Sequence, residues 1–383
     1  MIRTGIAGID EMIGSGIPRG SRVLYSMEPG VDGRLFMMST LEAALSMERR
    51  CLVVIPTSTA DAFKCELLEV KGLSLDPHKD SVTIIDCTAR KEVNRRVKGE
   101  RKRRTAWRKL LQETVKRDRT EVLFVYFDLL YEDLGLEGAL EVLSIPGVTV
   151  IVENLNLEGE DLIGRFSSAG LFDLIISMRS GFSLVPIFSF FTIEYVAWAS
   201  VPRRSIPYIS EDRHLRLYIP KIIVTGPPSS GKSTFVANAS DRGISVDRGD
   251  LDGFRTTVAM DLGWLHFKGF DITIYGTPGQ PRFDPIIPQL VKHAMGIILV
   301  LDSTRPDTLD RARELLELGF AAKLPLVVVA NKSDLPHEMN EQQIRKNLKL
   351  REDVPIFFMS ALKRSDVHYV VESMVDRITR HSF

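Results

Sequence analysis

The fold of the chain is decided by residues 221–234, KIIVTGPPSSGKST. Residues 226–233 match the pattern G-x-x-x-x-G-K-[ST] at every constrained position, an apolar β-branched run precedes them, and a helix-compatible segment follows. Glycines let such a loop curl so that backbone N–H groups and the next helix N-terminus attract phosphate oxygens. The stretch therefore predicts a site for a nucleoside triphosphate rather than an ordinary turn between a strand and a helix.

The residues of this phosphate-binding loop, or P-loop, have separate expected tasks. Lys232 is expected to reach the β- and γ-phosphates as a catalytic residue, and the Ser233 hydroxyl to ligate Mg²⁺. The residues expected to contact the nucleotide are Gly226, Pro227, Pro228, Ser229, Ser230, Gly231, Lys232, Ser233 and Thr234.

Length and composition predict a cytoplasmic protein of two domains. The chain has 383 residues, of which 44% are apolar and 26% charged, as is typical of a globular protein with an ample core. Its three cysteines, Cys51, Cys65 and Cys87, lack metal-binding spacing and are expected to be reduced. The sequence has no signal-peptide pattern, no myristoylation glycine and no prenylation cysteine, so no membrane anchor is expected.

Positive charge is concentrated in residues 90–119, which carry 14 Lys or Arg against 4 Asp or Glu. Low hydrophobicity predicts a solvated or mobile loop over 90–104, and a helix is expected to follow over 105–117. Such a run is most often a solvated face, and the alternatives are a nucleic-acid or an anionic-membrane surface. Only Trp107 is available there for stacking on bases, so nucleic acid is the less favoured partner.

The first half of the chain alternates strand and helix patterns. Repeated units of this kind predict a mostly parallel sheet with helices on both faces. A helix is expected over 34–46, and strands over 21–27, 51–56, 82–86, 121–127, 148–152 and 174–178, followed by a hairpin that ends near residue 200.

Two segments near the N-terminus resemble the opening of KaiC/RecA-type ATPase domains. They are residues 4–13, TGIAGIDEMI, and residues 16–21, GIPRGS. The resemblance implies that a P-loop follows at once. Here Met27 stands where the first glycine of that loop belongs, and Gly33 stands where its lysine belongs.

The catalytic acids that this resemblance implies are also altered. Residues 56–59, PTST, replace the acids expected after the second strand, and only Asp128 ends a strand as the metal-associated acid of the family does. We therefore expect residues 1–210 to be a degenerate KaiC/RecA-like domain that has lost hydrolysis. A polar connector over 206–216 is expected to mark the domain boundary.

Residues 221–383 resemble a Ras-like GTPase, in which one antiparallel hairpin lies beside parallel crossovers. A polar mobile loop is expected over 241–255, strands over 258–267, 270–275, 295–301, 325–330 and 356–359, and helices over 308–320, 341–350 and 367–380. The resemblance implies a GTPase domain over 215–383. The predicted fold class is α/β, with two P-loop-type three-layer αβα domains whose sheets are mostly parallel.

Residues 331–334, NKSD, match the N-K-x-D motif that selects guanine in that superfamily. The Asp334 carboxylate can accept two hydrogen bonds from the N1–H and N2–H₂ edge of guanine, a donor pair that adenine lacks. The resemblance implies that Asn331 braces the base and the P-loop, that the Lys332 stem lies along the base, and that the Ala361 N–H contacts guanine O6. The residues that resemble the S-A-K motif are Ser360, Ala361 and Leu362.

Two further segments resemble the switch regions of the superfamily in altered form. Residues 256–261, TTVAMD, make Thr257 the expected Mg²⁺ ligand and γ-phosphate sensor. Residues 276–283, GTPGQPRF, resemble D-x-x-G-Q-E-R-F. The Gly279 N–H is therefore expected to contact the γ-phosphate, and Gln280 to position the attacking water.

Two residues beside the switch segments are further candidates. Arg255 lies where cis-acting catalytic arginines of the superfamily occur, and a solvated loop arginine is the alternative. Gly276 stands where the motif has an aspartate that holds Mg²⁺ through a water molecule. Asp261 is the candidate metal-associated replacement if its strand shifts in register, and the alternative is an acid that faces solvent or caps the turn at Gly263.

These features predict a cytoplasmic two-domain nucleotide switch. It is expected to bind GTP and GDP with Mg²⁺, to hydrolyse GTP slowly without an activator, and to couple this GTPase to the RecA-like domain. Protein effectors and regulators are the expected partners, and a homo-oligomer is left open. The alternative is a GTP-regulated, nucleic-acid-associated scaffold that uses residues 90–119, while Met27 and Gly33 disfavour an ATP-driven motor.

Overall fold

The computed structural model describes residues 1–156, 170–180, 189–245, 248–251, 254–257, 261–319, 324–336 and 339–380. The chain divides into two compact units, unit 1 over Met1–Leu217 and unit 2 over Tyr218–Phe383. Within the described ranges, none of the helices has both the length and the apolar character needed to cross a membrane.

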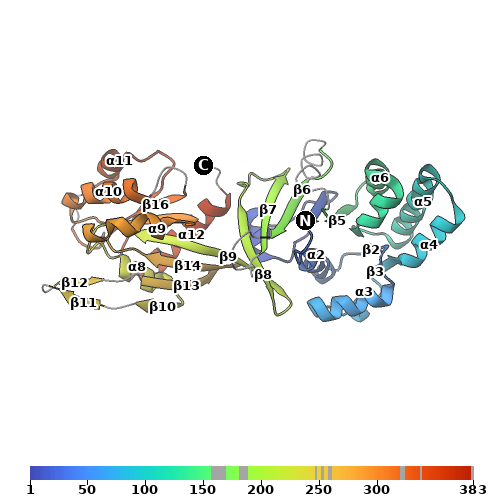
Figure 1. The fold of residues 1–383 in the computed structure, drawn as a ribbon, viewed down its shortest axis with the longest axis horizontal. Coiled ribbons are helices and arrows are strands. Elements are labelled where there is room, and N and C mark those ends of the chain that lie inside the picture. Colours follow the sequence, from blue (N-terminus) through green and yellow to red (C-terminus); the bar gives the residue numbers. More distant parts are fainter. Residues whose placement is uncertain are drawn as a thin grey trace. The chain divides into compact units, whose positions relative to one another are not determined.

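Unit 1, which begins at the blue end of the colour bar in Figure 1, is built on a sheet whose parallel part has the order β3-β2-β4-β5-β1-β6. Strands β7, β8 and the first residues of β9 continue it in antiparallel fashion. The parallel strands are apolar runs because both of their faces are buried. The strands are β1 Arg22–Met27, β2 Cys51–Ile55, β3 Val82–Asp86, β4 Val122–Tyr126, β5 Thr149–Leu155, β6 Leu174–Ser180, β7 Ser189–Val196, β8 Ser205–Glu211 and β9 His214–Thr225.

Helices cover both faces of this sheet. Neighbouring side chains of a strand point to opposite faces, so adjacent apolar residues of one strand pack against different helices. Leu24 of β1 belongs to a core completed by Trp107 and Leu134 of two helices, whereas the adjacent Tyr25 packs against Phe36 of a third. The predicted βα architecture is therefore confirmed. The helices are α1 Ala7–Met12, α2 Arg34–Ser46, α3 Ala60–Glu66, α4 Cys87–Arg96, α5 Glu100–Asp118 and α6 Asp128–Leu143.

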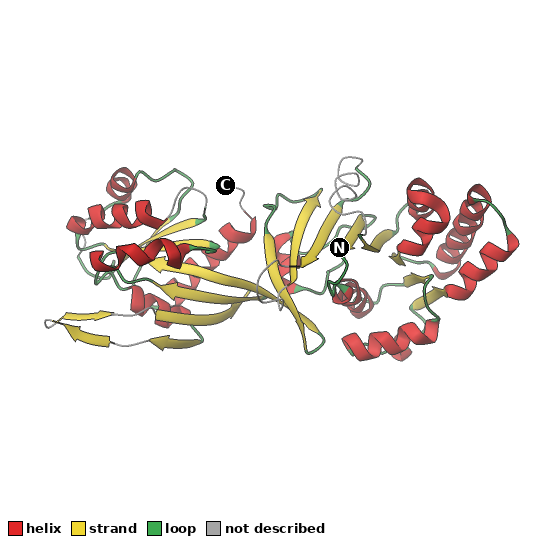
Figure 2. Ribbon diagram, viewed as in Figure 1, coloured by secondary structure: helices red, strands yellow, loops and turns green. Residues whose placement is uncertain are grey.

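The loop predicted over residues 90–104 is wrong, since α4 and α5 occupy most of it (Figure 2). Low hydrophobicity does not prevent a helix, because Arg, Lys and Glu have high helix propensity and opposite charges one turn apart attract each other. Arg104 illustrates this, as it pairs with Glu100 of its own helix and with Glu141 of α6. The basic run is therefore an ordered helical hairpin.

Two other segments, predicted to be a polar connector and a mobile loop, form strands. The connector predicted over 206–216 is most of β8 and the start of β9, in which exposed Arg216 precedes buried Leu217. The loop predicted over 241–255 contains three strands. An antiparallel strand can face solvent on one side, so polar composition alone did not identify them. These strands are β10 Arg242–Ser245, β11 Arg248–Leu251 and β12 Phe254–Thr257.

Unit 2 is built on a sheet of the order β10-β13-β14-β9-β15-β16-β17. Strands β9, β15, β16 and β17 are parallel, whereas β13 pairs with β10 and β14 in antiparallel fashion. The predicted hairpin beside parallel strands is therefore confirmed. The remaining strands are β13 Asp261–Phe267, β14 Phe270–Gly276, β15 Gly296–Asp302, β16 Leu326–Asn331 and β17 Ile356–Phe358.

Helices also lie on both faces of the sheet of unit 2. Leu299 of β15 shares a core with Ala312 of α10 and Ile344 of α11. On the opposite face, a Cβ at Gly296 would lie 2.5 Å from the Met374 Sδ of α12. Both units are α/β layers with helices on both faces, which is the predicted fold class. The helices are α8 Lys232–Ala239, α9 Ile287–Val291, α10 Leu309–Gly319, α11 Glu341–Leu348 and α12 Arg364–Arg380.

A buried carboxyl group lies in β5 of unit 1. Glu153 is 6% exposed, and its Oε2 has no hydrogen-bond partner among the residues that the structure describes. Burial, and then the negative charge of Asp128, raise the pKa of Glu153 well above its usual value. The core therefore favours the neutral form of this side chain.

The stability of unit 1 is expected to depend on this proton. Because the folded pKa is raised, the contribution of Glu153 is fully present below the unfolded pKa of about 4.3 and is lost as pH rises toward the folded value. Glu153→Gln should therefore raise the unfolding temperature near pH 8 and flatten its pH dependence. Calorimetry between about pH 5 and 8 measures this, with Glu137→Gln, at an exposed position of α6, as the control. Identical pH dependence of the two variants would contradict the expectation.

Candidate nucleotide-binding site

The P-loop joins β9 to α8, and its shape requires Gly231. This residue has a φ of +96°, and a Cβ there would lie 2.1 Å from the Asn331 Nδ2. Only glycine fits such a position without strain. Helix α8 begins at the next residue, Lys232, so the unpaired N–H groups of a helix N-terminus lie directly after the loop, where they favour an anion.

A pocket of about 310 Å³ is formed by four separate segments of unit 2. They are the P-loop with α8, the start of β13, the residues after β14 and the N-K-x-D loop. The structure thus brings Ser233, Asp261, Gly279 and Lys332 around one space. The lining residues are Pro228, Ser229, Gly231, Lys232, Ser233, Thr234, Asp261, Thr277, Pro278, Gly279 and Lys332.

Lys232 is buried at the floor of the P-loop, with 8% of its surface exposed. Its Nζ donates to the Gly226 carbonyl at 2.9 Å and to the Pro227 carbonyl at 2.7 Å. Burial lowers the pKa of Lys232 to about 7, an effect that the Asp261 charge opposes and the Arg311 charge adds to. A buried cation of this kind gains stability from an anionic ligand.

The Asn331 side chain links three loops. Its Nδ2 donates to the Ser230 carbonyl of the P-loop at 2.8 Å, and its Oδ1 accepts from the Ala361 N–H at 2.7 Å. The Ala361 carbonyl in turn accepts from the Asn238 Nδ2 of α8 at 2.6 Å. The Ala361 N–H therefore already donates to Asn331 Oδ1. To contact guanine O6 as expected, it must either donate to both oxygens or leave the Asn331 oxygen.

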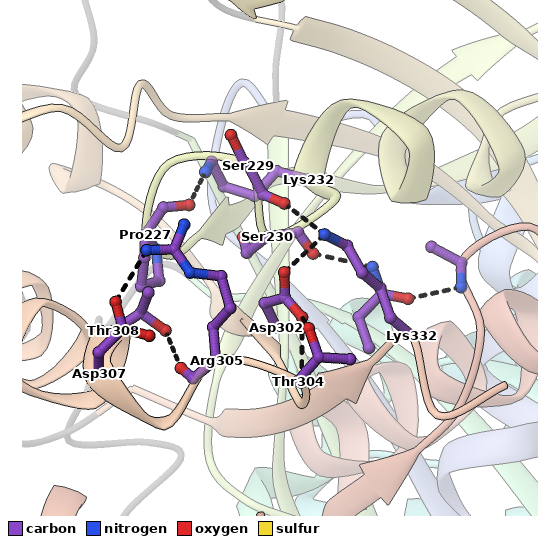
Figure 3. A network of polar contacts seen from close by, with 12 residues as sticks. Pro227, Ser229, Ser230, Lys232, Asp302, Thr304, Arg305, Asp307, Thr308 and Lys332 are labelled. Carbon is purple, nitrogen blue, oxygen red and sulfur yellow. Dashed lines mark hydrogen bonds and ion pairs between the residues drawn. The ribbon is translucent and has the colours of Figure 1, made fainter. Parts of the chain in front are cut away.

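Lys332 is held by a second set of contacts (Figure 3). Its Nζ donates to the Ser229 carbonyl at 3.0 Å and to Asp302 Oδ2 at 2.6 Å, while Thr304 donates to Asp302 Oδ1. Burial acts to raise the pKa of Asp302, but these hydrogen bonds hold it below its usual value. Sequence reasoning missed Asp302, although an acid followed by Ser303 and Thr304 at the end of an apolar strand was a usable signal.

The other base-side residues lie close to the same loops. Ser360 is buried, whereas Asp334 and Leu362 are exposed. The Ser333 N–H donates to the Met359 carbonyl at 3.2 Å, which ties the N-K-x-D loop to the S-A-K-like loop. The 310 Å³ pocket lies on the P-loop side of these residues, because P-loop residues and Lys332 line it whereas Ser360, Asp334 and Leu362 do not.

The structure describes the side chains of the second switch segment, residues 276–283, but not those of residues 256 and 257 in the first. Gly279 lines the pocket, and Gln280 is a partly buried residue at the start of the short helix η3, Pro281–Ile286. Thr257 lies in β12, opposite Arg248 of β11. The side chains of Thr257 and Arg255 lie outside the described residues, so their expected roles stay predictions.

Asp261 stands directly opposite Gly276 in the register of β13 and β14. It is 5% exposed and lines the pocket together with Ser233. A Cβ at Gly276 would lie 3.1 Å from the Asp261 Cβ and 3.3 Å from its Oδ2. The carboxylate therefore lies beside the position where a side chain of residue 276 would begin. The observed register already brings the Asp261 side chain beside residue 276, so this proximity requires no shift of the strand. Because Asp261 is buried, the alternative of a solvent-facing acid is wrong.

The corresponding loop of unit 1 has a different interior. A Cβ at Gly33 would lie 2.4 Å from the Met27 Sδ and 2.7 Å from the Met178 Sδ, and Met27 is buried. Two thioethers thus occupy the space beside the start of α2. Asp128 accepts from the Asn154 Nδ2 at 2.9 Å, and the described part of the chain holds no group of three His, Cys, Asp or Glu arranged to bind a metal ion.

Comparison with solved structures finds similarity to a KaiC-like protein from the archaeon Pyrococcus horikoshii OT3. The identity is 16% and the TM-score is 0.45, and the similarity covers 57% of this chain and 98% of the other.

The C-terminal part of the chain has well-defined relatives. A model of the Ras family matches residues 221–380. The Ras-related protein Rab-27B of Homo sapiens is 27% identical over 183 residues, which cover 43% of this chain and 81% of that protein. The Ras-related protein RABA5a of Arabidopsis thaliana is 31% identical over 177 residues, 45% of this chain and 78% of that protein. Through this part, the chain belongs to the Ras family.

Proposed function

We propose that unit 2 is a guanine-nucleotide switch that binds GTP and GDP with Mg²⁺ and hydrolyses GTP slowly to GDP. Membership of the Ras family supports a nucleotide-binding GTPase in general. The main structural support for binding of a guanine nucleotide is the Asn331 side chain, which joins the P-loop to the S-A-K-like loop. A phosphate loop and a base loop braced by one amide make a site for a single nucleotide.

Selection of guanine is assigned to the N-K-x-D loop. Asp334 would accept hydrogen bonds from the N1–H and N2–H₂ groups, and the Lys332 stem would lie along the base. Adenine would leave the Asp334 carboxylate unpaired, and sites built around such polar pairing discriminate by up to about 10⁴-fold. The residues proposed to complete the base site are Asn331, Ser360, Ala361 and Leu362.

The phosphates and the metal ion are assigned to the 310 Å³ pocket. Lys232 and the other P-loop residues would hold the phosphates, and the hydroxyls of Ser233 and Thr257 would ligate Mg²⁺. The pocket fits a hard cation beside phosphate, because Ser233 and Asp261 bring oxygen atoms to its lining. Bound Mg²⁺ neutralises negative charge on the phosphates during transfer.

Asp261 is proposed to replace the aspartate that is missing at Gly276. The two positions are opposite each other in the hairpin, and a Cβ at Gly276 would nearly touch the Asp261 side chain. An acid on either strand would therefore project a carboxylate toward Ser233 from the same place. A carboxylate of this kind would act through water molecules bound to Mg²⁺, which it would orient by hydrogen bonds without contacting the nucleotide.

Hydrolysis is assigned to the segment that follows β14. The Gly279 N–H would contact the γ-phosphate, and Gln280 would orient the attacking water. Arg255 is retained as a candidate cis-acting arginine. Without an arginine at the developing charge, hydrolysis in P-loop GTPases is slower by about 10³–10⁵-fold, which supports a slow basal rate and an activating partner.

Unit 1 is proposed to be a non-hydrolysing KaiC/RecA-like domain over residues 1–210, coupled to the GTPase domain over 215–383. Its support is the pair of buried thioethers at Met27 and Met178, which lie beside Gly33, the residue that stands where the resemblance expects the P-loop lysine. We further propose that the protein is cytoplasmic and binds protein effectors and regulators.

The nucleic-acid alternative has weaker support. Part of the positive charge of the basic run is used inside unit 1, since Arg90 pairs with Asp133 while Arg104 and Arg108 pair with Glu141. These pairs attach α4 and α5 to α6. The basic run therefore has a structural role that needs no polyanion.

The guanine assignment predicts a change of specificity in Asp334→Asn. The amide offers a donor and an acceptor where the carboxylate offers two acceptors, so GTP affinity should fall by roughly 10²-fold or more and xanthosine triphosphate should bind better. Competition of fluorescent GDP with each triphosphate measures this. Unchanged preference for GTP would show that this loop does not read the base.

Loss of the only complete P-loop should abolish triphosphate binding. In the full chain, Lys232→Ala removes the cation expected at the β- and γ-phosphates, so both GTP and ATP should bind at least about 10²-fold more weakly than GTP binds to the unaltered chain. Equilibrium binding of the two labelled nucleotides checks this. Tight ATP binding that survives the substitution would assign a working nucleotide site to unit 1.

The metal assignment predicts that an acid on either strand of the hairpin suffices. Asp261→Ala should raise the Mg²⁺ concentration needed to retain bound GDP by about 10–100-fold. The exchange variant Asp261→Gly with Gly276→Asp should restore it, since removal of the Asp261 side chain makes room at residue 276. Dissociation of labelled GDP across a Mg²⁺ titration measures this, with Asp271→Ala of the same hairpin as the control. An unchanged Mg²⁺ requirement in Asp261→Ala would refute the assignment.

A further inference from the structure

Arg311 is a largely buried arginine that connects α10 to the second switch segment. Its side chain is 14% exposed. Its Nε donates to the Gly279 carbonyl at 3.3 Å, and its two terminal nitrogens donate to the two carboxylate oxygens of Asp284 in η3. Such a bidentate pair fixes both the position and the plane of the guanidinium. A third acceptor is Glu314, at 3.0 Å on the same helix.

The segment that Arg311 holds is confined on its other side by the P-loop. A Cβ at Gly279 would lie 2.5 Å from the Gly226 carbonyl oxygen and 2.8 Å from the Pro228 nitrogen. Gly279 therefore lies in van der Waals contact with the P-loop while Arg311 binds its carbonyl. The chain is fixed from two directions at the residue before Gln280.

This carbonyl belongs to the planar peptide that joins Gly279 to Gln280. Holding the oxygen therefore sets the direction of the Gln280 N–H and the point from which its side chain starts. The Gln280 carbonyl is also engaged, since it accepts from the Phe283 N–H at 3.1 Å as η3 begins. Gln280 is thus oriented at both of its peptide bonds.

The carboxylates around Arg311 indicate that this side chain positions the backbone rather than stabilising negative charge on phosphate directly. Asp284 and Glu314 place two carboxylates on one guanidinium. Their hydrogen bonds raise the pKa of Arg311 although burial acts to lower it. A guanidinium neutralised in this way has little net charge left for a phosphate group, whereas its geometry remains well fixed.

We propose that Arg311, anchored by Asp284, is a positioning residue that holds the Gly279–Gln280 peptide in place for GTP hydrolysis. The inference rests on the proposed function and deepens it. GDP lacks the γ-phosphate against which this segment is expected to act, so GDP binding should not depend on Arg311. A displacement of about 1 Å at a reacting group can lower a rate by about 10²-fold, which sets the expected size of the effect.

The test is single-turnover hydrolysis of GTP by the full chain with Mg²⁺, together with the affinities for GTP and GDP. Arg311→Ala should slow hydrolysis by about 10²-fold and leave GDP affinity within about threefold of the unaltered chain. Arg311→Lys keeps the charge without the bidentate fork and should show an intermediate loss. The matched control is Arg313→Ala, which removes an arginine of the same helix that is 37% exposed and pairs with Asp310 one turn away, and it should have no effect.

Three results would decide against the proposal or against its basis. An unchanged hydrolysis rate in folded Arg311→Ala or Arg311→Lys overturns it. Equal losses of GTP and GDP affinity in both variants, with a lowered unfolding temperature, also overturn it, since they indicate a role in folding alone. Failure of the unaltered chain to bind or hydrolyse GTP overturns the proposed function instead.

Discussion

The carboxamide of Asn331 is the contact on which the nucleotide site depends. It is 3% exposed, and each of its ends has a partner, the Ser230 carbonyl on one side and the Ala361 N–H on the other. Loss of either partner would leave a buried polar group unpaired, at a cost of about 1–3 kcal/mol. The same Nδ2 excludes any side chain at Gly231. One amide at the end of β16 therefore sets the shape of the P-loop and the position of the S-A-K-like loop together.

Short motifs locate most residues of this candidate site in the sequence, because each motif specifies its own backbone. The P-loop needs a glycine at 231, and N-K-x-D needs a turn after a buried strand, so both could be located from sequence. Contacts between distant segments could not be located. Nothing in the sequence indicates that Asp302 pairs with Lys332 or that Arg311 reaches Gly279, because each pair depends on how strands and helices are packed. The helix predicted over 105–117 lies within α5, whereas most of the loop predicted over 90–104 is helical, because helix propensity and ion pairs outweigh low hydrophobicity there.

The two units differ in the side chains that line the loop between a strand and the next helix. In unit 2, backbone carbonyls hold the Lys232 ammonium beside a pocket lined by hydroxyl and carboxylate groups. In unit 1, the methionines Met27 and Met178 meet at Gly33. A thioether is only a weak hydrogen-bond acceptor and offers no donor to a phosphate oxygen. The glycine at 33 is therefore explained by packing around sulfur, and its presence in a strand-loop-helix unit does not imply a nucleotide.

The relation between Asp261 and Gly276 shows that two positions far apart in sequence can place side chains at one point in space. Residues directly opposite in an antiparallel pair have their Cβ atoms close together on the same face of the sheet. A carboxylate can therefore reach the same place from either strand. The contact of 3.1 Å that a Cβ at 276 would make with the Asp261 Cβ means that both positions cannot comfortably carry a side chain. A glycine at position 276 is then the expected companion of the buried Asp261 side chain opposite it.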